Sequence, residues 1–130
     1  MGPLASLLVL ALNIITIEAQ YAFQGRLYCR KVWSSLLLQY QERMSFHPMN
    51  HHMTLEMYDP PNHARLAQGF RESDFTFDNQ TNWLAVSDQS IWKKGSGFWD
   101  PKWWTKFVFH EDVDGWTVGG SAGDRWFKRC

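Results

Sequence analysis

Short stretches in which apolar and polar residues alternate recur along the chain, and this is the pattern of half-buried β-strands. The clearest stretch covers residues 53–58 and leads into the turn sequence Asp59-Pro60-Pro61-Asn62. A looser alternation predicts an opening strand within residues 21–29. Shorter strands are expected at residues 65–70, 75–77, 83–86, 104–110, 116–118 and 125–128. A spacing of about 8 to 12 residues between strands predicts an all-β fold, a small antiparallel sandwich.

One segment between the first two strands has a different period. Its apolar residues recur at the spacing of one helical face. They are Trp33, Leu36, Leu37, Tyr40 and Met44. The spacing predicts a short amphipathic helix, which should end before Pro48 because proline cannot donate a helical hydrogen bond.

The first residues differ in character from all that follow. Residues 4–17 contain no charged side chain and consist mainly of Leu, Ile, Val and Ala. An apolar run of about 14 residues is too short to span a ~30 Å hydrocarbon layer, so we interpret residues 1–19 as a secretory signal peptide. The alternative, a buried N-terminal helix, is disfavoured by the β-branched run at residues 14–17 and by the lack of a polar face.

Composition predicts one globular domain over residues 20–130. The whole chain of 130 residues carries 8 Trp, 9 Phe and 4 Tyr, which are enough to build a core. Its 13 basic and 13 acidic side chains cancel, and no run of Lys or Arg occurs, which argues against a nucleic-acid partner. Residues 20–130 contain no apolar run of the length that a transmembrane helix needs.

Two cysteines, Cys29 and Cys130, are present in a chain that the signal peptide would send to an oxidising compartment. A bridge between them would close a loop of about 100 residues, which the chain-entropy model values at up to about 4 to 5 kcal/mol. Cys130 could equally stay free or pair with another chain, and the sequence leaves these alternatives open.

Three segments occur in a suggestive order. Residues 23–29 carry Gly-Arg-Leu followed shortly by Cys, residues 53–59 alternate and end in Asp, and Asp100-Pro101-Lys102 precedes a strand that ends at His110. In this order they resemble the nematode transthyretin-like family, whose members are secreted and fold as a prealbumin-like β-sandwich. The resemblance implies an extracellular or cell-surface role.

The chain departs from that family's pattern in several places, so it resembles a divergent member. An inserted segment at about residues 31–50 separates the first two matching strands. The family's Asp-Gly-x-Phe turn is represented by Glu72-Ser73-Asp74-Phe75, which lacks the glycine. No cysteine follows His110 within the next few residues.

Catalysis is not expected, and neither is a cofactor. The chain contains no Gly-x-Ser-x-Gly elbow, phosphate-binding loop or His-Glu-x-x-His motif, and its last residues lack the Tyr-Arg-Gly-Ser signature of the hydrolase that shares the transthyretin fold. Imidazole and thioether groups that would suit copper gather at His47, Met49, His51, His52 and Met53. A solvated, His-rich turn is the favoured interpretation, and no metal site is predicted. His110 is interpreted as a strand-end histidine.

Tryptophan and lysine are concentrated between residues 92 and 106. We hypothesise a binding surface formed by Trp99, Trp103, Trp104 and Lys106, because exposed aromatic and basic side chains suit a protein partner or an anionic lipid headgroup. The alternative places these tryptophans in the core. Asn79-Gln80-Thr81 is a candidate N-glycosylation site.

The function expected from the sequence is therefore binding outside the cell. The partner would be an extracellular or cell-surface protein or an anionic lipid. A Trp-rich carbohydrate-binding module is the main alternative, and a metal-binding protein is a third.

Overall fold

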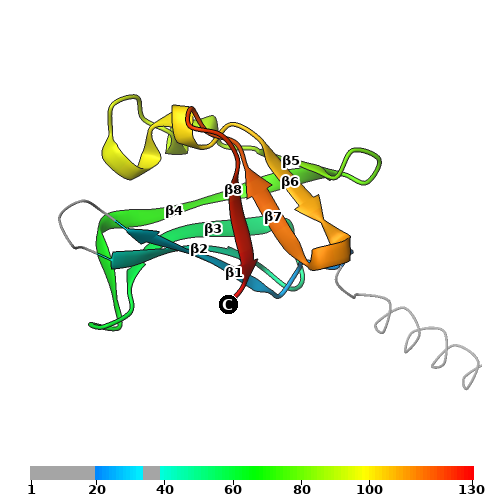
Figure 1. Cartoon of the computed structure of the whole chain (residues 1–130). Helices are drawn as coiled ribbons and strands as arrows, with labels where there is room; N and C mark the ends of the chain where they lie inside the picture. The colour runs from blue at the N-terminus through cyan, green and yellow to red at the C-terminus, as the bar shows by residue number, and fades with distance from the viewer. Residues whose placement is uncertain (1–19, 34–38) are drawn as a thin grey trace, which may run out of the picture.

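The computed structural model describes residues 20–33 and 39–130, which form a single antiparallel sheet of eight strands. The strands are β1 (Leu27–Trp33), β2 (Gln39–Phe46), β3 (His52–Asp59), β4 (Ala64–Asp78), β5 (Trp83–Val86), β6 (Phe107–His110), β7 (Gly115–Val118) and β8 (Arg125–Arg129) (Figure 1). Four 3-10 turns, η1 (Gln89–Ile91), η2 (Gly97–Trp99), η3 (Pro101–Trp103) and η4 (Glu111–Val113), join the later strands. The expected signal peptide, residues 1–19, lies outside the described residues.

The sheet closes on itself because β1 pairs with β8 as well as with β2. Tyr28 lies opposite Arg129 and Cys29 lies opposite Lys128. A disulfide joins Cys29 of β1 to Cys130, the residue that follows β8, with 5.1 Å between the Cα atoms. The all-β, antiparallel prediction is thus confirmed, and of the alternatives left open for the cysteines the structure has the intramolecular bridge. The sheet, however, forms a closed barrel in place of the expected two-layer sandwich.

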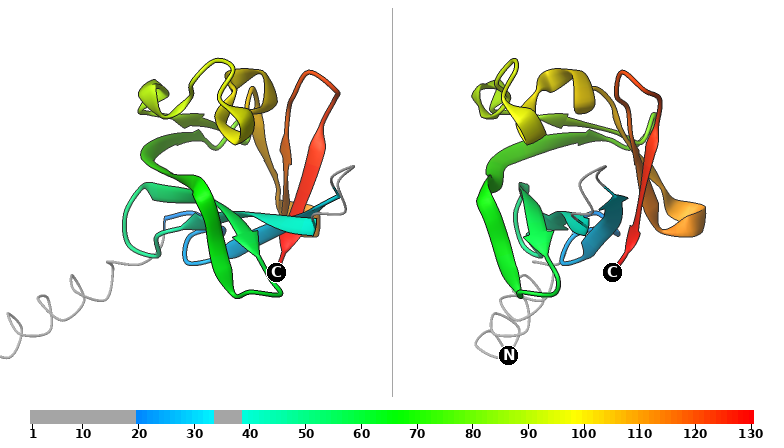
Figure 2. Two further views of the ribbon diagram at one scale, coloured as in Figure 1. Left: turned by 90° about the vertical axis from the view of Figure 1, so that its left-hand side faces the viewer. Right: turned by 60° about the vertical axis from the view of Figure 1, so that its left-hand side comes forward.

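The long strand β4 explains why a barrel forms. Its first part pairs with β3 and its second part with β5. The bent strand β4 therefore belongs to both sides of the barrel (Figure 2). The bend lies at Gln68, whose φ is 54°, and at Gly69, where a Cβ atom would lie 2.9 Å from the Cβ of Met57. The two separate strands predicted at residues 65–70 and 75–77 are therefore one. The polar residues between them were interpreted as a turn, but Glu72 and Asp74 lie on the outer face of a continuous strand and contact His52.

The predicted helix over residues 33–44 is wrong wherever the structure describes it. Trp33 ends β1, and residues 39–44 belong to β2, whose inward side chains alternate with outward ones. Tyr40 and Met44 are four residues apart, and this interval fits a helical face as well as one side of a strand. Glu42 lies between them on the same inward side and interrupts the apolar alternation that would have indicated a strand. The remaining residues of the prediction, 34–38, lie outside the described part.

An aromatic cluster fills one end of the barrel. Its members are Phe23, Tyr28, Phe46, Phe75, Phe109 and Trp116, all at most 5 % exposed. Phe46 and Trp116 stack with ring centroids 5.1 Å apart, while Phe23 meets Trp116 edge to face at 4.8 Å. Residues 20–25 close this end, where the Gly25 amide donates a hydrogen bond to the Phe46 carbonyl. Eight strands enclose a space that side chains can fill, and the aromatic cluster fills this end of it.

A polar cluster around Asp114 ties β1 and β8 together below the aromatic cluster. The Asp114 carboxylate accepts hydrogen bonds from the Tyr28 hydroxyl at 2.6 Å, from Arg26 at 3.0 Å and from Arg129 at 2.9 Å. Burial alone would raise the pKa of Asp114, but the hydrogen bonds from Tyr28 and Arg129 and the charge of Arg26 hold it below its ordinary value. Burial and the contact with Asp114 raise the pKa of Tyr28.

We expect Asp114→Asn to lower the free energy of unfolding by about 1 to 2 kcal/mol at neutral pH, because three charge-assisted hydrogen bonds are weakened. Asparagine tolerates the left-handed backbone at this position, where φ is 48°. The lowered folded pKa means that the contribution of Asp114 is complete above its unfolded pKa of about 4 and is lost as pH falls through the folded value. Urea unfolding of both proteins should therefore differ at neutral pH and converge in acid, and an equal difference at both would contradict this account.

In the described part of the chain, no helix has the length and apolar character needed to cross a membrane.

Candidate functional site

A solvent-open cavity of about 1010 Å³ lies at the end of the barrel away from the aromatic cluster. Pockets of about 300 to 1,000 Å³ are the usual size for small-molecule sites. Strands β1, β2, β4 and β8 form its walls, and the loop between β5 and β6 covers it. The described lining consists of Arg30, Val32, Tyr40, Glu42, Ala67, Gln68, Trp103, Arg125 and residues 93–99.

A stack of three tryptophans holds the covering loop on the barrel. The rings of Trp92 and Trp104 stack with centroids 5.6 Å apart, and Trp99 stacks on Trp104 at 5.7 Å. The Trp99 indole N–H donates to the Gln68 carbonyl at 2.7 Å, so the bend of β4 anchors the loop. Figure 2 shows this loop, in yellow, over one end of the sheet. The packing fixes one wall of the cavity, because Trp99 is only 1 % exposed.

Asp100 organises the two tight turns of the loop. Its carboxylate accepts hydrogen bonds from the backbone amide of Lys102 at 3.1 Å and from that of Gly95 at 3.0 Å. These two hydrogen bonds lower the pKa of Asp100, so the carboxylate stays ionised. The short loop thereby gains a defined shape without a regular helix.

Three charged residues form a cluster within the cavity wall. The Glu42 carboxylate accepts from Arg30 Nη1 at 2.7 Å and from Arg125 Nη1 at 3.1 Å. Arg125 also donates to the Trp103 carbonyl, and its guanidinium lies 4.5 Å from the centre of the Trp104 ring. Burial lowers the pKa of Arg125, and the neighbouring Glu42 counteracts that effect. A single buried carboxylate thus serves two guanidinium groups.

Aromatic side chains provide the rest of the cavity surface. Tyr40 and Phe98 meet edge to face with ring centroids 5.4 Å apart, and Trp103 is partly exposed beside them. Burial raises the pKa of Tyr40, and the charge of Glu42 adds to that effect. The cavity therefore offers an apolar, aromatic wall next to a charged one.

The residues of the hypothesised Trp and Lys surface lie in different surroundings. Trp99 and Trp103 line the cavity, whereas Trp104 is 5 % exposed and packs behind them. Lys106 lies on the outer face, with its Nζ 4.2 Å from the ring centre of the exposed Trp83. The structure thus brings two of the four residues together at one site and places Trp104 as their support.

The other sequence candidates lie outside the cavity. His47 and Met49 are exposed, while His52 faces outward and Met53 faces the core. The histidine and methionine side chains that were considered as copper ligands therefore point in different directions. Within residues 20–33 and 39–130, no group of three His, Cys, Asp or Glu side chains is placed to hold a metal ion. Asn79 is exposed in the turn between β4 and β5.

His52 and His110 both have partners of their own. His52 contacts Asp74 at 3.0 Å and Glu72 at 3.2 Å, and these hydrogen bonds raise its pKa. His110 shares a hydrogen bond with Thr117 at 2.8 Å at the end of β6, where a strand-end histidine was expected.

Sequence reasoning missed the charged residues of the cavity. Arg30 lies opposite Glu42 in the β1–β2 pair, whereas Arg125 is 83 residues from Glu42 in the chain and joins them because β8 pairs with β1. One signal was present: Glu42 lies at an inward position of an alternating strand, between Tyr40 and Met44. A buried carboxylate needs a cationic partner, so this position indicated that a basic residue must lie nearby.

Comparisons of the chain with family models, with curated proteins and with solved structures find no match. The resemblance to transthyretin-like proteins therefore stays a prediction.

Proposed function

We propose that this protein acts by binding, and that it holds a small organic molecule in the barrel cavity. The observation that carries the proposal is the cavity of about 1010 Å³ with Tyr40, Phe98 and Trp103 on its wall. Eight-stranded barrels are wide enough either to be filled by side chains or to hold one small ligand. In this barrel the buried core fills the interior beside the aromatic cluster, and the cavity opens at the other end, under the covering loop.

The composition of the lining supports binding over catalysis. Among the lining residues that the structure describes, there is no histidine or cysteine. The charged groups Arg30, Glu42 and Arg125 are engaged with one another. They are suited to orienting a bound molecule.

We further propose that binding takes place outside the cell. The signal-like residues 1–19 support this, and so does the disulfide between Cys29 and Cys130, because such bonds persist in oxidising compartments. The exposed sequon at Asn79 is a suitable acceptor for a glycan in that compartment.

The proposal is tested with the neutral fluorescent probe N-phenylnaphthylamine, whose aromatic body matches the cavity wall. We expect one probe to bind per protein molecule. Val32→Trp places a large ring in the cavity, because Val32 follows Arg30 on the inward side of β1, and should weaken probe binding by about tenfold or more. Lys31→Trp adds the same ring on the outward side of the strand and should leave the affinity unchanged.

Near-ultraviolet circular dichroism checks that both variants remain folded. If the probe fails to bind, or if the two variants bind it equally well, the cavity is not the binding site. Competition by soluble sugars would favour the alternative of a carbohydrate-binding module, for which Phe98 and Trp103 would supply stacking surfaces.

A further inference from the structure

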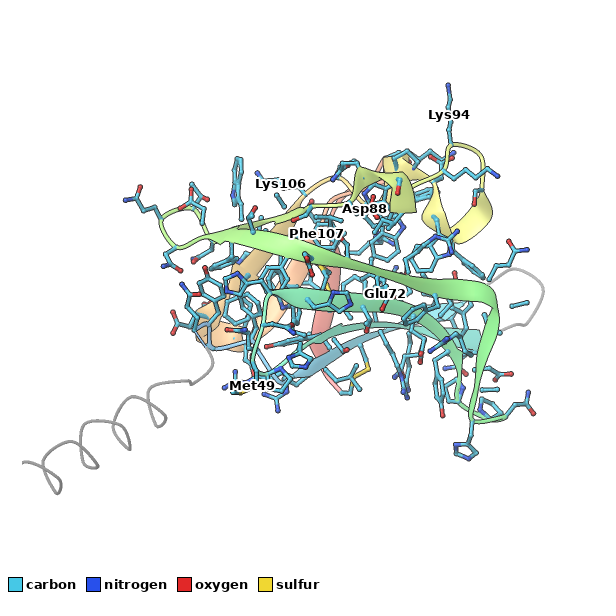
Figure 3. The ribbon with its side chains drawn as sticks, turned by 180° about the vertical axis from the view of Figure 1, so that it is seen from behind. Met49, Glu72, Asp88, Lys94, Lys106 and Phe107 are labelled. Atoms are coloured by element: carbon cyan, nitrogen blue, oxygen red, sulfur yellow. A yellow bond between two sulfur atoms is a disulfide. The ribbon has the colours of Figure 1, made fainter. Side chains whose placement is uncertain are left out.

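The cavity wall carries more positive than negative charge. Its described lining holds four basic residues, Arg30, Lys93, Lys94 and Arg125, and one acidic residue, Glu42. Lys94 extends from the covering loop into solvent (Figure 3), so it lies at the rim. After Glu42 balances one guanidinium, the wall keeps an excess of positive charge. An excess of this kind attracts anions into a partly desolvated site.

Hydrogen-bonding capacity in the cavity favours the same kind of ligand. Arginine and lysine side chains only donate hydrogen bonds. Three acceptors of the wall are already engaged: Glu42 accepts from Arg30 and Arg125, the Trp103 carbonyl from Arg125, and the Gln68 carbonyl from Trp99. The buried Nε of Arg125 has no acceptor at all among the described residues. A ligand that brings acceptors matches this unpaired donor and the basic side chains of the wall.

The two arginines have different access to the cavity. The side chain of Arg30 is 31 % exposed, whereas that of Arg125 is 14 % exposed and is held by Glu42 and by the Trp103 carbonyl. Arg30 is therefore the group that an incoming ligand can reach. Arg125 acts as a positioning residue, since it fixes Glu42 and through it the orientation of Arg30.

We infer that the ligand is an organic anion, whose carboxylate, sulfonate or similar group binds to Arg30 while its apolar or aromatic body lies against Tyr40, Phe98 and Trp103. The planar fork of a guanidinium matches the two oxygens of such a group. Glu42 keeps the two arginines paired when the site is empty, and Lys93 adds positive charge at the rim. This inference rests on the proposed function, because it names the class of ligand for the same cavity.

The test compares two probes with nearly the same ring system. Anilinonaphthalene sulfonate carries a sulfonate, and N-phenylnaphthylamine lacks it. We expect the wild-type protein to bind the sulfonate more tightly than the neutral probe. Arg30→Gln should weaken sulfonate binding by about tenfold and thereby reduce the preference of the protein for the sulfonate over the neutral probe. Arg30→Lys keeps the charge and should retain most of the preference.

Lys31→Gln is the matched control, because it removes one positive charge from the next residue of β1 on the exposed side. It should change the affinity for neither probe. Equal wild-type affinity for both probes, or an equal effect of Arg30→Gln and Lys31→Gln, would overturn the anion assignment while the cavity remains a binding site. If neither probe binds, the proposed function fails together with the inference.

Discussion

Replacing both cysteines by serine, Cys29→Ser together with Cys130→Ser, is expected to lower the free energy of unfolding by about 4 kcal/mol. The bridge spans 101 residues of sequence, so in the unfolded chain it removes the freedom of almost the whole described domain. It also lies where the barrel closes, and β1 and β8 share only two residue pairs in register there, Tyr28 with Arg129 and Cys29 with Lys128. Few backbone hydrogen bonds can compensate for its loss.

The measurement is urea unfolding of the double variant and of the wild-type protein. Both cysteines are replaced together so that no free thiol remains to join two molecules. The wild-type protein collected from the medium of expressing cells should be two hydrogens lighter than after reduction. Unfolding of the two proteins at the same urea concentration would show that strand pairing alone closes the barrel.

The second large effect is expected for Trp99→Ala, which should cost about 3 to 5 kcal/mol of unfolding free energy. Trp99 is 1 % exposed, stacks on Trp104 and donates its indole N–H to the Gln68 carbonyl. Its removal leaves a void in the wall of the cavity and releases the covering loop from β4. The affinity for N-phenylnaphthylamine should therefore fall together with the stability.

Two further variants separate the causes. Trp99→Phe keeps an aromatic ring but loses the hydrogen bond, and we expect it to cost about 1 to 2 kcal/mol. Trp83→Ala removes a tryptophan that is 50 % exposed on the outer face and lies beside Lys106, so it should cost about 1 kcal/mol or less and leave probe binding unchanged. A similar loss of stability in Trp83→Ala and Trp99→Ala would contradict the assignment of Trp99 to the cavity wall.

The strands that could be predicted from the sequence are those whose period is undisturbed. Residues 53–58 alternate without interruption and lie in β3, and the short apolar run at residues 83–86 forms β5. In β2 the inward position 42 holds a glutamate where an apolar residue would be expected, so the two-residue period of the strand is not visible in the sequence. A carboxylate is expected on the outside unless its partners are known. Those partners, Arg30 and Arg125, depend on which strands are neighbours.

The closed barrel could not be predicted in the same way. Closure depends on the pairing of β1 with β8 and on the bend in β4 at Gln68 and Gly69, and neither feature produces a local pattern of apolar residues. The cysteines were the one long-range signal, but the sequence left their pairing open, and the structure joins them where the barrel closes. The tryptophan-rich loop was recognised as a candidate site, but the cavity beside it depends on the closed barrel.

The pairing of β1 with β8 has a consequence for synthesis of the protein. Residues 27–33 leave the ribosome early, yet their second neighbour, residues 125–129, follows almost a hundred positions later. Until then β1 keeps an unpaired edge, which is a surface that promotes association between chains. The barrel can thus close only after residues 125–129 have been translated. Oxidation of Cys29 and Cys130 then links the closed strands covalently.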